Sequence, residues 1–229
     1  MNPMNNVLIT GAGRGIGLEF ARRFAAAGAH IHATVRDLAK ADALRALGAS
    51  ATIHTCDVTS DAHVGALADL LGDTPIDILI NNAGILLNRG ESFDTLDVAD
   101  LEETLRVNTV APVRVMQALA GNVARSQRKL IVNISSRMGS VSEASGSNYS
   151  YRASKAALNM AVKILANDLK GRGVTAIVVH PGWVQTDMGG PSASLTIEQS
   201  VDGLMKVIDG VGLRDTGSFI NHDGSRIPW

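Results

Sequence analysis

The sequence predicts a doubly wound α/β fold, in which one parallel sheet carries helices on both faces. Short apolar, β-branched runs alternate with helix-forming stretches from residue 6 to residue 220. These runs are apolar at nearly every position, which is typical of parallel strands covered on both faces. The 229 residues, 45% of them hydrophobic, are enough for one large core, so we expect residues 1–229 to form a single domain.

Seven strands and six helices are expected in turn along the chain. The strands are expected at residues 6–10, 30–35, 51–55, 76–80, 129–134, 173–179 and 218–220. The helices are expected at residues 18–27, 38–47, 60–71, 97–125, 151–169 and 197–207. Gly28 ends the first helix, as glycine often does.

A glycine-rich turn joins the first predicted strand to the first predicted helix. It matches T-G-x-x-x-G-x-G through Thr10, Gly11, Gly15 and Gly17, whereas Ile16 stands where the more usual G-x-G-x-x-G would end. Backbone N–H groups at a helix start can hold a pyrophosphate, and glycines let it come close. No Gly-Lys-Ser/Thr follows, which excludes a Walker loop. A turn without a ligand is the alternative, and the strand–turn–helix context argues against it.

Other polar and small residues follow the ends of the remaining predicted strands. They are Arg36, Asp57, the run Asn81-Asn82-Ala83-Gly84, Ser136 and Pro181-Gly182. Ligands of open α/β sheets bind outside the carboxyl ends of the strands. We therefore expect these residues to line one crevice together with the glycine loop.

Tyr151 and Lys155 lie four residues apart in a predicted helix and therefore share one of its faces. A phenol has a pKa of about 10, and a nearby cation lowers it. Such a phenol can exchange a proton with an alcohol or carbonyl oxygen. The pair alone is weak evidence, because this spacing is common by chance. Tyr149 has no such partner, since Ala153 follows it by four residues.

Composition argues against several classes of protein. The net charge of −1 gives no basic surface for nucleic acid or membrane. The single Cys56 excludes an internal disulfide and fits a reducing cytosol. The run from Val7 to Ile9 is too short for a signal peptide, and no apolar run is long enough to span a bilayer. Six scattered histidines show no metal-ligand spacing, so we expect a cytoplasmic protein without a metal.

Taken together, these residues resemble the short-chain dehydrogenase/reductase family over nearly the whole chain. The motifs occur in the family's order: Thr10-Gly11-x-x-x-Gly15-x-Gly17, Asp57-Val58, Asn81-Asn82-Ala83-Gly84, Asn108, Ser136, Tyr151-x-x-x-Lys155 and Pro181-Gly182. Residues 134–140, 149–155 and 223–229 resemble the sniffer-type and C-factor-type carbonyl reductases. The resemblance implies a Rossmann fold and reversible hydride transfer between nicotinamide C4 and a carbonyl or alcohol carbon.

The resemblance also implies a catalytic set of Asn108, Ser136, Tyr151 and Lys155. Tyr151 would donate or accept the proton, and Lys155 would lower its pKa and bind the nicotinamide ribose. Ser136 would hydrogen-bond the substrate oxygen, and Asn108 would hold a water that links Lys155 to solvent. Ser135 is the rival serine, but in the family the serine is followed by two residues and a glycine, as Ser136 is here.

A cofactor site is implied in the same way. Its residues would be Gly11, Arg14, Gly15, Ile16, Gly17, Arg36, Asp57, Val58, Asn82, Ala83, Gly84, Tyr151, Lys155, Pro181, Gly182, Val184 and Thr186. Asp57 and Val58 would flank adenine, while residues 82–84 would line the ribose side. Val184 and Thr186 would fix the nicotinamide carboxamide.

Two arginines favour NADP(H) over NAD(H). In NAD-using relatives an acidic residue closes the second strand and binds the ribose hydroxyls, but Val35 holds that position here. Arg36 follows, where a guanidinium can clamp a 2′-phosphate, and Arg14 could reach the same phosphate. The alternative uses Asp37 as the ribose acceptor, although Asp37 is equally explained as the N-cap of the next helix.

The substrate region is short and rich in small residues. Family members with large lipophilic substrates often carry longer lids than residues 188–195 provide, so we expect an open pocket for small or varied aldehydes and ketones. Trp183 would wall this pocket, and packing beneath the cofactor explains it equally well. Helices 97–125 and 151–169 carry apolar residues on more than one side. In this family they often pair across a two-fold axis, which predicts a homodimer or homotetramer.

Two other functions are compatible with the same motifs. One is a dinucleotide-binding signalling protein of the C-factor type with little turnover, against which the intact catalytic set argues. The other is a nucleotide-sugar epimerase or dehydratase. Those relatives usually carry an added C-terminal substrate domain, for which 229 residues leave no room.

Overall fold

The computed structural model describes residues 6–229, in which seven parallel strands form one sheet. The strands are β1 (Asn6–Ile9), β2 (His30–Val35), β3 (Ala51–Thr55), β4 (Ile78–Asn81), β5 (Leu130–Ile134), β6 (Thr175–His180) and β7 (Phe219–Asn221). Their order across the sheet is β3-β2-β1-β4-β5-β6-β7. The order reverses between β1 and β4, and doubly wound sheets bind ligands at that point. The predicted fold class is confirmed.

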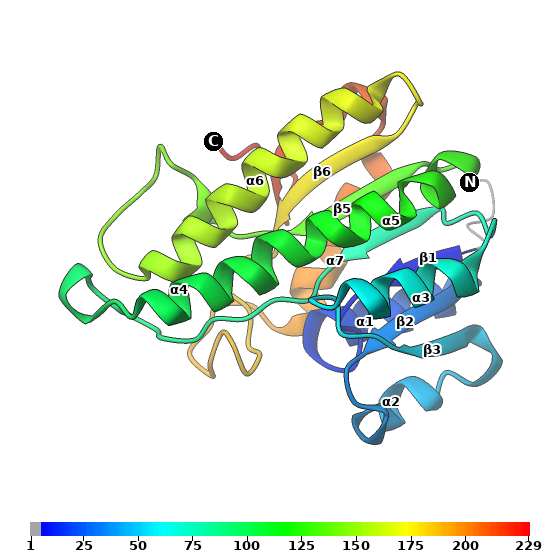
Figure 1. The fold of residues 1–229 in the computed structure, drawn as a ribbon, viewed down its shortest axis with the longest axis horizontal. Coiled ribbons are helices and arrows are strands. Elements are labelled where there is room, and N and C mark those ends of the chain that lie inside the picture. Colours follow the sequence, from blue (N-terminus) through cyan, green and yellow to red (C-terminus); the bar gives the residue numbers. More distant parts are fainter. Residues whose placement is uncertain (1–5) are drawn as a thin grey trace.

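Helices cover both faces of the sheet (Figure 1). The α-helices are α1 (Gly15–Ala26), α2 (Asp42–Arg45), α3 (Asp61–Leu71), α4 (Val98–Leu105), α5 (Ala111–Arg125), α6 (Tyr149–Lys170) and α7 (Ile197–Gly210). A π-helical turn, η4 (Arg106–Val110), joins α4 to α5. Short 3₁₀ turns are η1 (Leu38–Lys40), η2 (Gly48–Ser50), η3 (Phe93–Thr95), η5 (Arg137–Gly139) and η6 (Leu213–Asp215). In residues 6–229 no helix has the length and apolar character to cross a bilayer.

Two apolar clusters, one on each face, hold the helices to the sheet. Val7 and Ile9 of β1 pack with α1, α2 and α7, and Leu8 between them packs with α3, α5 and α6. All three are fully buried. Burying such a side chain is worth roughly 1.5–3 kcal/mol, so a strand that is apolar throughout stabilises both layers at once. This sandwich fixes where each strand ends, and hence where the site residues stand.

Two predicted helices differ from what the structure shows. A single helix over residues 38–47 is wrong, because η1 and α2 are separate turns. The Asp37 carboxylate accepts from the Ala39 N–H, and the Arg45 guanidinium donates to the Leu38 carbonyl. These side chains satisfy backbone groups that a continuous helix would pair within itself. The predicted helix 97–125 is nearly continuous, but η4 inserts a wider turn at Asn108, and such turns are frequent at functional sites.

Candidate active site

The glycine loop between β1 and α1 lies against the segment that follows β4. Gly11 and Gly15 have φ angles of +65° and +57°, in the left-handed region that glycine adopts without strain. A Cβ on Gly11 would lie 3.0 Å from the Ala83 Cα, and one on Gly17 would lie 2.5 Å from the Asn82 side-chain nitrogen. Glycine at these positions therefore allows the close approach of the two loops.

The start of α1 offers backbone donors to an anion. In the described part of the chain, Arg14 at the N-cap position makes no side-chain cap, and the first turn carries no acidic residue. The first N–H groups of a helix have no partner within the helix, and the helix dipole favours negative charge there. The loop and the helix start thus fit a dinucleotide pyrophosphate.

Thr10 and Asn82 lock this loop. The Thr10 hydroxyl oxygen accepts from the N–H groups of Asn82 and Ala83 at 3.0 and 3.1 Å. The Asn82 amide nitrogen donates to the carbonyls of Thr10 and Gly11 at 2.9 and 3.1 Å. The Asn82 side chain thus cross-links the ends of β1 and β4, and its expected place beside the ribose stays a prediction. Its effect on a bound cofactor would come through the shape of the glycine loop.

The residues expected at the adenosine end occupy the ends of β2 and β3. Arg36 is exposed there, and Val58 is buried in the apolar cluster on the α3 side. Hydrogen bonds from the Thr59 hydroxyl and N–H lower the pKa of Asp57, and the positive charge of Arg36 adds to this effect. The Asp37 carboxylate caps η1, which supports the interpretation of Asp37 as a cap. Arg36 forms no ion pair with the residues that the structure describes.

Tyr151 and Lys155 share the inner face of α6, as predicted. The Lys155 Nζ lies 5.7 Å from the Tyr151 ring centroid and donates to the Ile134 carbonyl at 2.9 Å. Burial raises the pKa of Tyr151 to about 12 and lowers the pKa of Lys155 to about 8. Burial thus raises the phenol pKa in this structure, and the lowering by Lys155 that the sequence suggests stays a prediction. Loss of hydration outweighs the opposing effects, which come from a hydrogen bond to Ser136 and the charge of Arg89.

Ser136 is the serine that faces Tyr151. The Ser135 hydroxyl is turned away and donates to the Asn159 Oδ1 at 2.7 Å. The Ser136 oxygen caps η5 by accepting from the Met138 N–H at 3.1 Å. A Cβ on Gly139 would lie 2.8 Å from the Lys155 backbone, so η5 sits directly on α6. This close packing sets Ser136 beside the phenol and explains why a glycine follows it.

Asn108 anchors the segment after β4 against α6. Its amide nitrogen donates to the Ile85 carbonyl at 2.9 Å and to the Ser154 hydroxyl at 3.1 Å. Its Oδ1 accepts from the Ile85 N–H at 2.8 Å. A Cβ on Gly84 would lie 3.1 Å from that oxygen and 3.6 Å from the Lys155 Nζ. Both N–H groups of the amide are therefore occupied, and the side chain positions Gly84 next to the lysine.

The segment after β6 faces the glycine loop. A Cβ on Gly15 would lie 3.6 Å from the Thr186 methyl group. Val184 is buried, and Pro181 and Gly182 form the turn that leads to it. The Trp183 side chain is 50% exposed and its Nε1 donates to the Gly189 carbonyl at 2.9 Å. An indole so exposed is not packed in the core, and its role as a wall of the substrate pocket stays a prediction.

Two residues of the site were missed in the sequence. The Tyr151 hydroxyl contacts the Met188 sulfur at 3.9 Å, and the Arg89 guanidinium donates to the Met188 carbonyl. Met188 lies in the segment that was expected to leave the pocket open. In the structure its side chain contacts the Tyr151 hydroxyl and covers that part of the pocket. Arg89 lies in an irregular segment with neither periodicity nor motif, and nothing in the sequence distinguished it.

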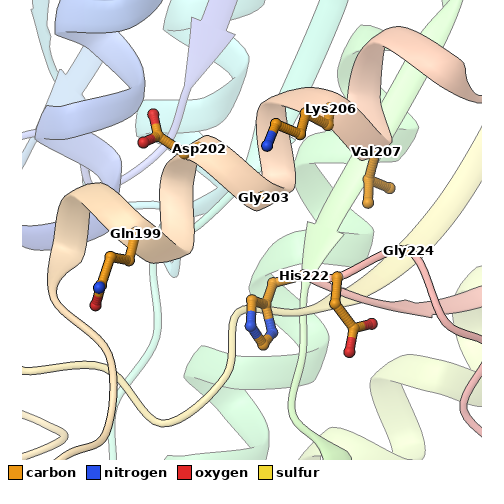
Figure 2. Close-up of a pocket in the computed structure, with 8 residues that line it drawn as sticks. Gln199, Asp202, Gly203, Lys206, Val207, His222 and Gly224 are labelled. Carbon is orange, nitrogen blue, oxygen red and sulfur yellow. The ribbon is translucent and has the colours of Figure 1, made fainter.

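A separate groove lies between α7 and the turn after β7 (Figure 2). Its volume is about 440 Å³, and its lining residues are Gln199, Asp202, Gly203, Lys206, Val207, His222, Asp223 and Gly224. None of the predicted site residues lines it. A Cβ on Gly182 would lie 3.2 Å from the His222 ring, so His222 packs behind the turn that carries Val184 and Thr186. The groove is therefore distinct from the site around Tyr151.

Comparison with known proteins agrees with this geometry. The family model described as short chain dehydrogenase matches residues 5–195. The protein "C-signal" of Myxococcus xanthus is 41% identical over 156 residues, which are 68% of this chain and 93% of that protein. A 1-hydroxy-2-glutathionyl-2-methyl-3-butene dehydrogenase of Rhodococcus sp. (strain AD45) is 32% identical over 237 residues, covering 99% of this chain and all of that protein.

Solved structures show the same similarity over the full chain. An NADPH-bound carbonyl reductase from chicken fatty liver aligns with a TM-score of 0.91 and 32% identity, covering 100% of both chains. The carbonyl reductase Sniffer of D. melanogaster has the same score and identity over 99% of this chain and 100% of its own. With the match to the family model, these similarities show that the chain belongs to the short-chain dehydrogenase/reductase family.

Proposed function

We propose that the protein is an NADP(H)-dependent carbonyl reductase or alcohol dehydrogenase that acts on small ketones or aldehydes. One observation carries the proposal: Tyr151, Lys155 and Ser136 meet at the carboxyl edge of the sheet, beside a glycine loop shaped for a dinucleotide. Similar structures support the cofactor. The chicken carbonyl reductase is NADPH-bound, and a carbonyl reductase from Pseudomonas aeruginosa PAO1, 33% identical, is in complex with NADP.

The residues present fit this cofactor. N–H groups of the glycine loop would hold its pyrophosphate, and Arg14 and Arg36 would reach the 2′-phosphate. Asp57 and Val58 would lie at adenine, and Ala83 and Gly84 at the ribose. Gly182, Val184 and Thr186 would lie at the nicotinamide, where Tyr151 and Lys155 also stand. Bound NADPH would supply the hydride.

Tyr151 would supply the proton. With a pKa of about 12 its phenol is neutral at pH 7 and so holds the proton that a carbonyl oxygen needs on reduction. The Ser136 hydroxyl would hydrogen-bond that same oxygen and orient it. Lys155, with a pKa of about 8, is largely charged at pH 7, and its ammonium would stabilise the phenolate as the proton leaves. Alcohol oxidation would use the same groups in reverse.

A panel of small aldehydes and ketones tests this proposal. Loss of reduced-cofactor absorbance should accompany turnover, with NADPH used in preference to NADH. Tight cofactor binding with no turnover of any carbonyl or alcohol would overturn it. That outcome would favour the second candidate, a dinucleotide-binding signalling protein with little turnover, which the similarity to "C-signal" supports.

We also propose that two copies of the chain associate through α5 and α6. Val110 at the end of η4 and Val113 in the first turn of α5 are 47% and 38% exposed, and Met160 and Ile164 on α6 are 62% and 54% exposed. Each pair lies three or four residues apart and so shares a helix face. Exposed apolar faces of this kind commonly mark contacts between copies. The single-domain organisation and a cytoplasmic location stay predictions.

A further inference from the structure

We propose that Arg89 determines substrate specificity and selects carbonyl compounds that carry an anionic group, a carboxylate or a phosphate. The inference rests on the proposed function, because it names the substrate class of the same site. Arg89 stands on the segment between β4 and α4 and reaches across the site to the segment after β6, where it donates to the Met188 carbonyl.

Arg89 acts on the reacting end of Tyr151. The Met188 residue that it holds places its sulfur 3.9 Å from the Tyr151 hydroxyl. The positive charge of Arg89 lowers the pKa of that phenol, against the larger effect of burial. No acidic residue is among the charged groups that influence it. A substrate whose carbonyl oxygen meets the hydroxyl therefore enters a field that favours negative charge.

Arg89 has no acidic partner in the described residues, where its guanidinium donates to a neutral carbonyl. Acidic groups on neighbouring segments are engaged elsewhere. Asp187 pairs with Arg14, and Asp100 accepts from the Asn88 amide. The buried Glu91 carboxylate accepts from the Ser150 N–H at 2.6 Å through Oε1, and its Oε2 has no partner among the described residues, Arg89 included. The guanidinium thus keeps donors for a carboxylate or phosphate, which it can bind with two parallel hydrogen bonds.

The backbone that carries Arg89 is fixed in place. The Gly90 N–H donates to the Asn148 Oδ1 at 2.9 Å, and the Asn148 N–H donates to the Glu91 carbonyl at 2.8 Å. Asn148 in turn is the N-cap residue of α6, less than one helical turn from Tyr151. The exposed cation of Arg89 is therefore carried by a backbone segment that is tied to the start of α6. Such preorganisation reduces the cost of ordering a binding group.

Binding of an anion at Arg89 would also uncover the phenol. A guanidinium bonds a charged acceptor more strongly than a neutral carbonyl, so the anion would displace the Met188 carbonyl. The segment would then be released, and the Met188 sulfur would leave the Tyr151 hydroxyl to the substrate oxygen. A neutral carbonyl compound cannot replace the Met188 carbonyl at the Arg89 guanidinium in this way. It must therefore displace the Met188 side chain without a stronger hydrogen bond to Arg89.

Matched substrates test the proposal with the full enzyme and NADPH. We would compare kcat/KM for 3- and 4-formylbenzoate with the values for the corresponding formylbenzamides, which have the same aldehyde and nearly the same size. The parent should prefer the acids by roughly ten-fold, the value of a partly exposed charged hydrogen bond. Arg89→Gln should remove the preference, and Arg89→Lys should keep part of it.

Arg172 provides the matched control. It is exposed and without an ion pair among the described residues, but it lies in the turn before β6, at the opposite edge of the sheet. Arg172→Gln should leave the acid-to-amide ratio unchanged. An acid-to-amide ratio at or below one in the parent would overturn the proposal. So would equal losses for acid and amide in Arg89→Gln, because Arg89 would then serve only to anchor Met188.

A binding measurement separates this proposal from the proposed function. Calorimetry on NADPH-loaded Tyr151→Phe would give the Kd of each acid and amide without turnover. Tighter binding of the acids than of the amides to Tyr151→Phe, and equal binding of both to Tyr151→Phe/Arg89→Gln, would support anion recognition by Arg89. This result would hold even if the parent reduced none of the compounds. Equal Kd values would overturn it, whether or not the enzyme reduces carbonyls.

Discussion

Arg14 in the glycine loop forms an ion pair with Asp187 in the segment after β6. The pair joins the two segments that would hold opposite ends of the cofactor. Both side chains are largely exposed, at 75% and 78%. The guanidinium expected to serve a 2′-phosphate is therefore shared with a carboxylate of the protein itself.

Asp187→Asn should strengthen NADPH binding, because it leaves Arg14 free for the phosphate. An exposed ion pair is worth about 0–1 kcal/mol, so we expect a two- to five-fold lower Kd for NADPH and little change for NADH. Fluorescence titration of the reduced nicotinamide measures both. Asp73→Asn, which removes an exposed partner of Arg125, is the control. Weaker or unchanged NADPH binding in Asp187→Asn would show that Arg14 does not serve the phosphate.

Arg36→Ala should reduce the preference for NADPH over NADH. Hydrogen bonds from charged groups are worth roughly 1.5–3 kcal/mol; after discounting for exposure, two arginines should give the parent about a ten- to hundred-fold preference. The ratio of kcat/KM for the two reduced cofactors with one carbonyl substrate measures it. If the parent prefers NADH, or the ratio survives the substitution, Asp37 becomes the better candidate for the ribose contact.

Tyr151→Phe should abolish most turnover and leave cofactor binding nearly intact. The phenyl ring keeps the packing of α6 but has no proton to give, and general acid–base catalysis contributes roughly 10²–10⁴-fold. Steady-state rates and cofactor titration on the same preparation separate the two effects. Near-normal rates in the variant would exclude Tyr151 as the acid.

Stability should fall as the pH drops from about 6.5 to 4, because of His32. Burial, with the charges of His54 and His30, lowers the pKa of His32 to about 4. Its Nδ1 lies 3.2 Å from the His54 Nε2. In this range the unfolded chain binds more protons than the folded one, so the free energy of unfolding decreases as the pH falls. The free energy of unfolding at pH 5 should be about 1–2 kcal/mol lower than at pH 7.

Urea denaturation of the parent and of His32→Gln at pH 7 and pH 5 measures this effect. The variant should lose less stability between the two pH values than the parent does. Burial also lowers the pKa of His180 to about 4. His180 should therefore preserve part of the dependence of stability on pH in the variant. An identical slope in His32→Gln would show that its protonation is not coupled to folding.

Ile164→Glu should dissociate the proposed oligomer. A carboxylate on the exposed face of α6 would have to lose its hydration in any contact between copies, while in the monomer it would stay in water. Light scattering at micromolar concentration should show a dimer or tetramer for the parent and a monomer for the variant. A parent that is monomeric under these conditions would remove the basis for this interface.

The sequence was sufficient for the fold and for most of the site. Strands such as β2 and β3 are short runs rich in β-branched residues, and their predicted bounds agree with the structure. Parallel strands place their carboxyl ends on one edge of the sheet, which is why residues as distant as Gly11 and Pro181 could be grouped from sequence alone. Local signals with a physical cause, such as the Asp37 cap, were also readable.

Only the tertiary structure decided what depends on contacts between distant segments. The packing of η5 on α6 places Ser136, which the sequence had already favoured, beside Tyr151 and turns Ser135 towards Asn159. The raised pKa of Tyr151 follows from its burial beneath other segments. The pairing of Arg14 with Asp187 and the reach of Arg89 to Met188 join residues about 170 and 100 positions apart. Periodicity and spacing describe neighbours along the chain, so they contain no information on such pairs. The site's electrostatics are therefore a property of packing, whereas its chemical groups are a property of the sequence.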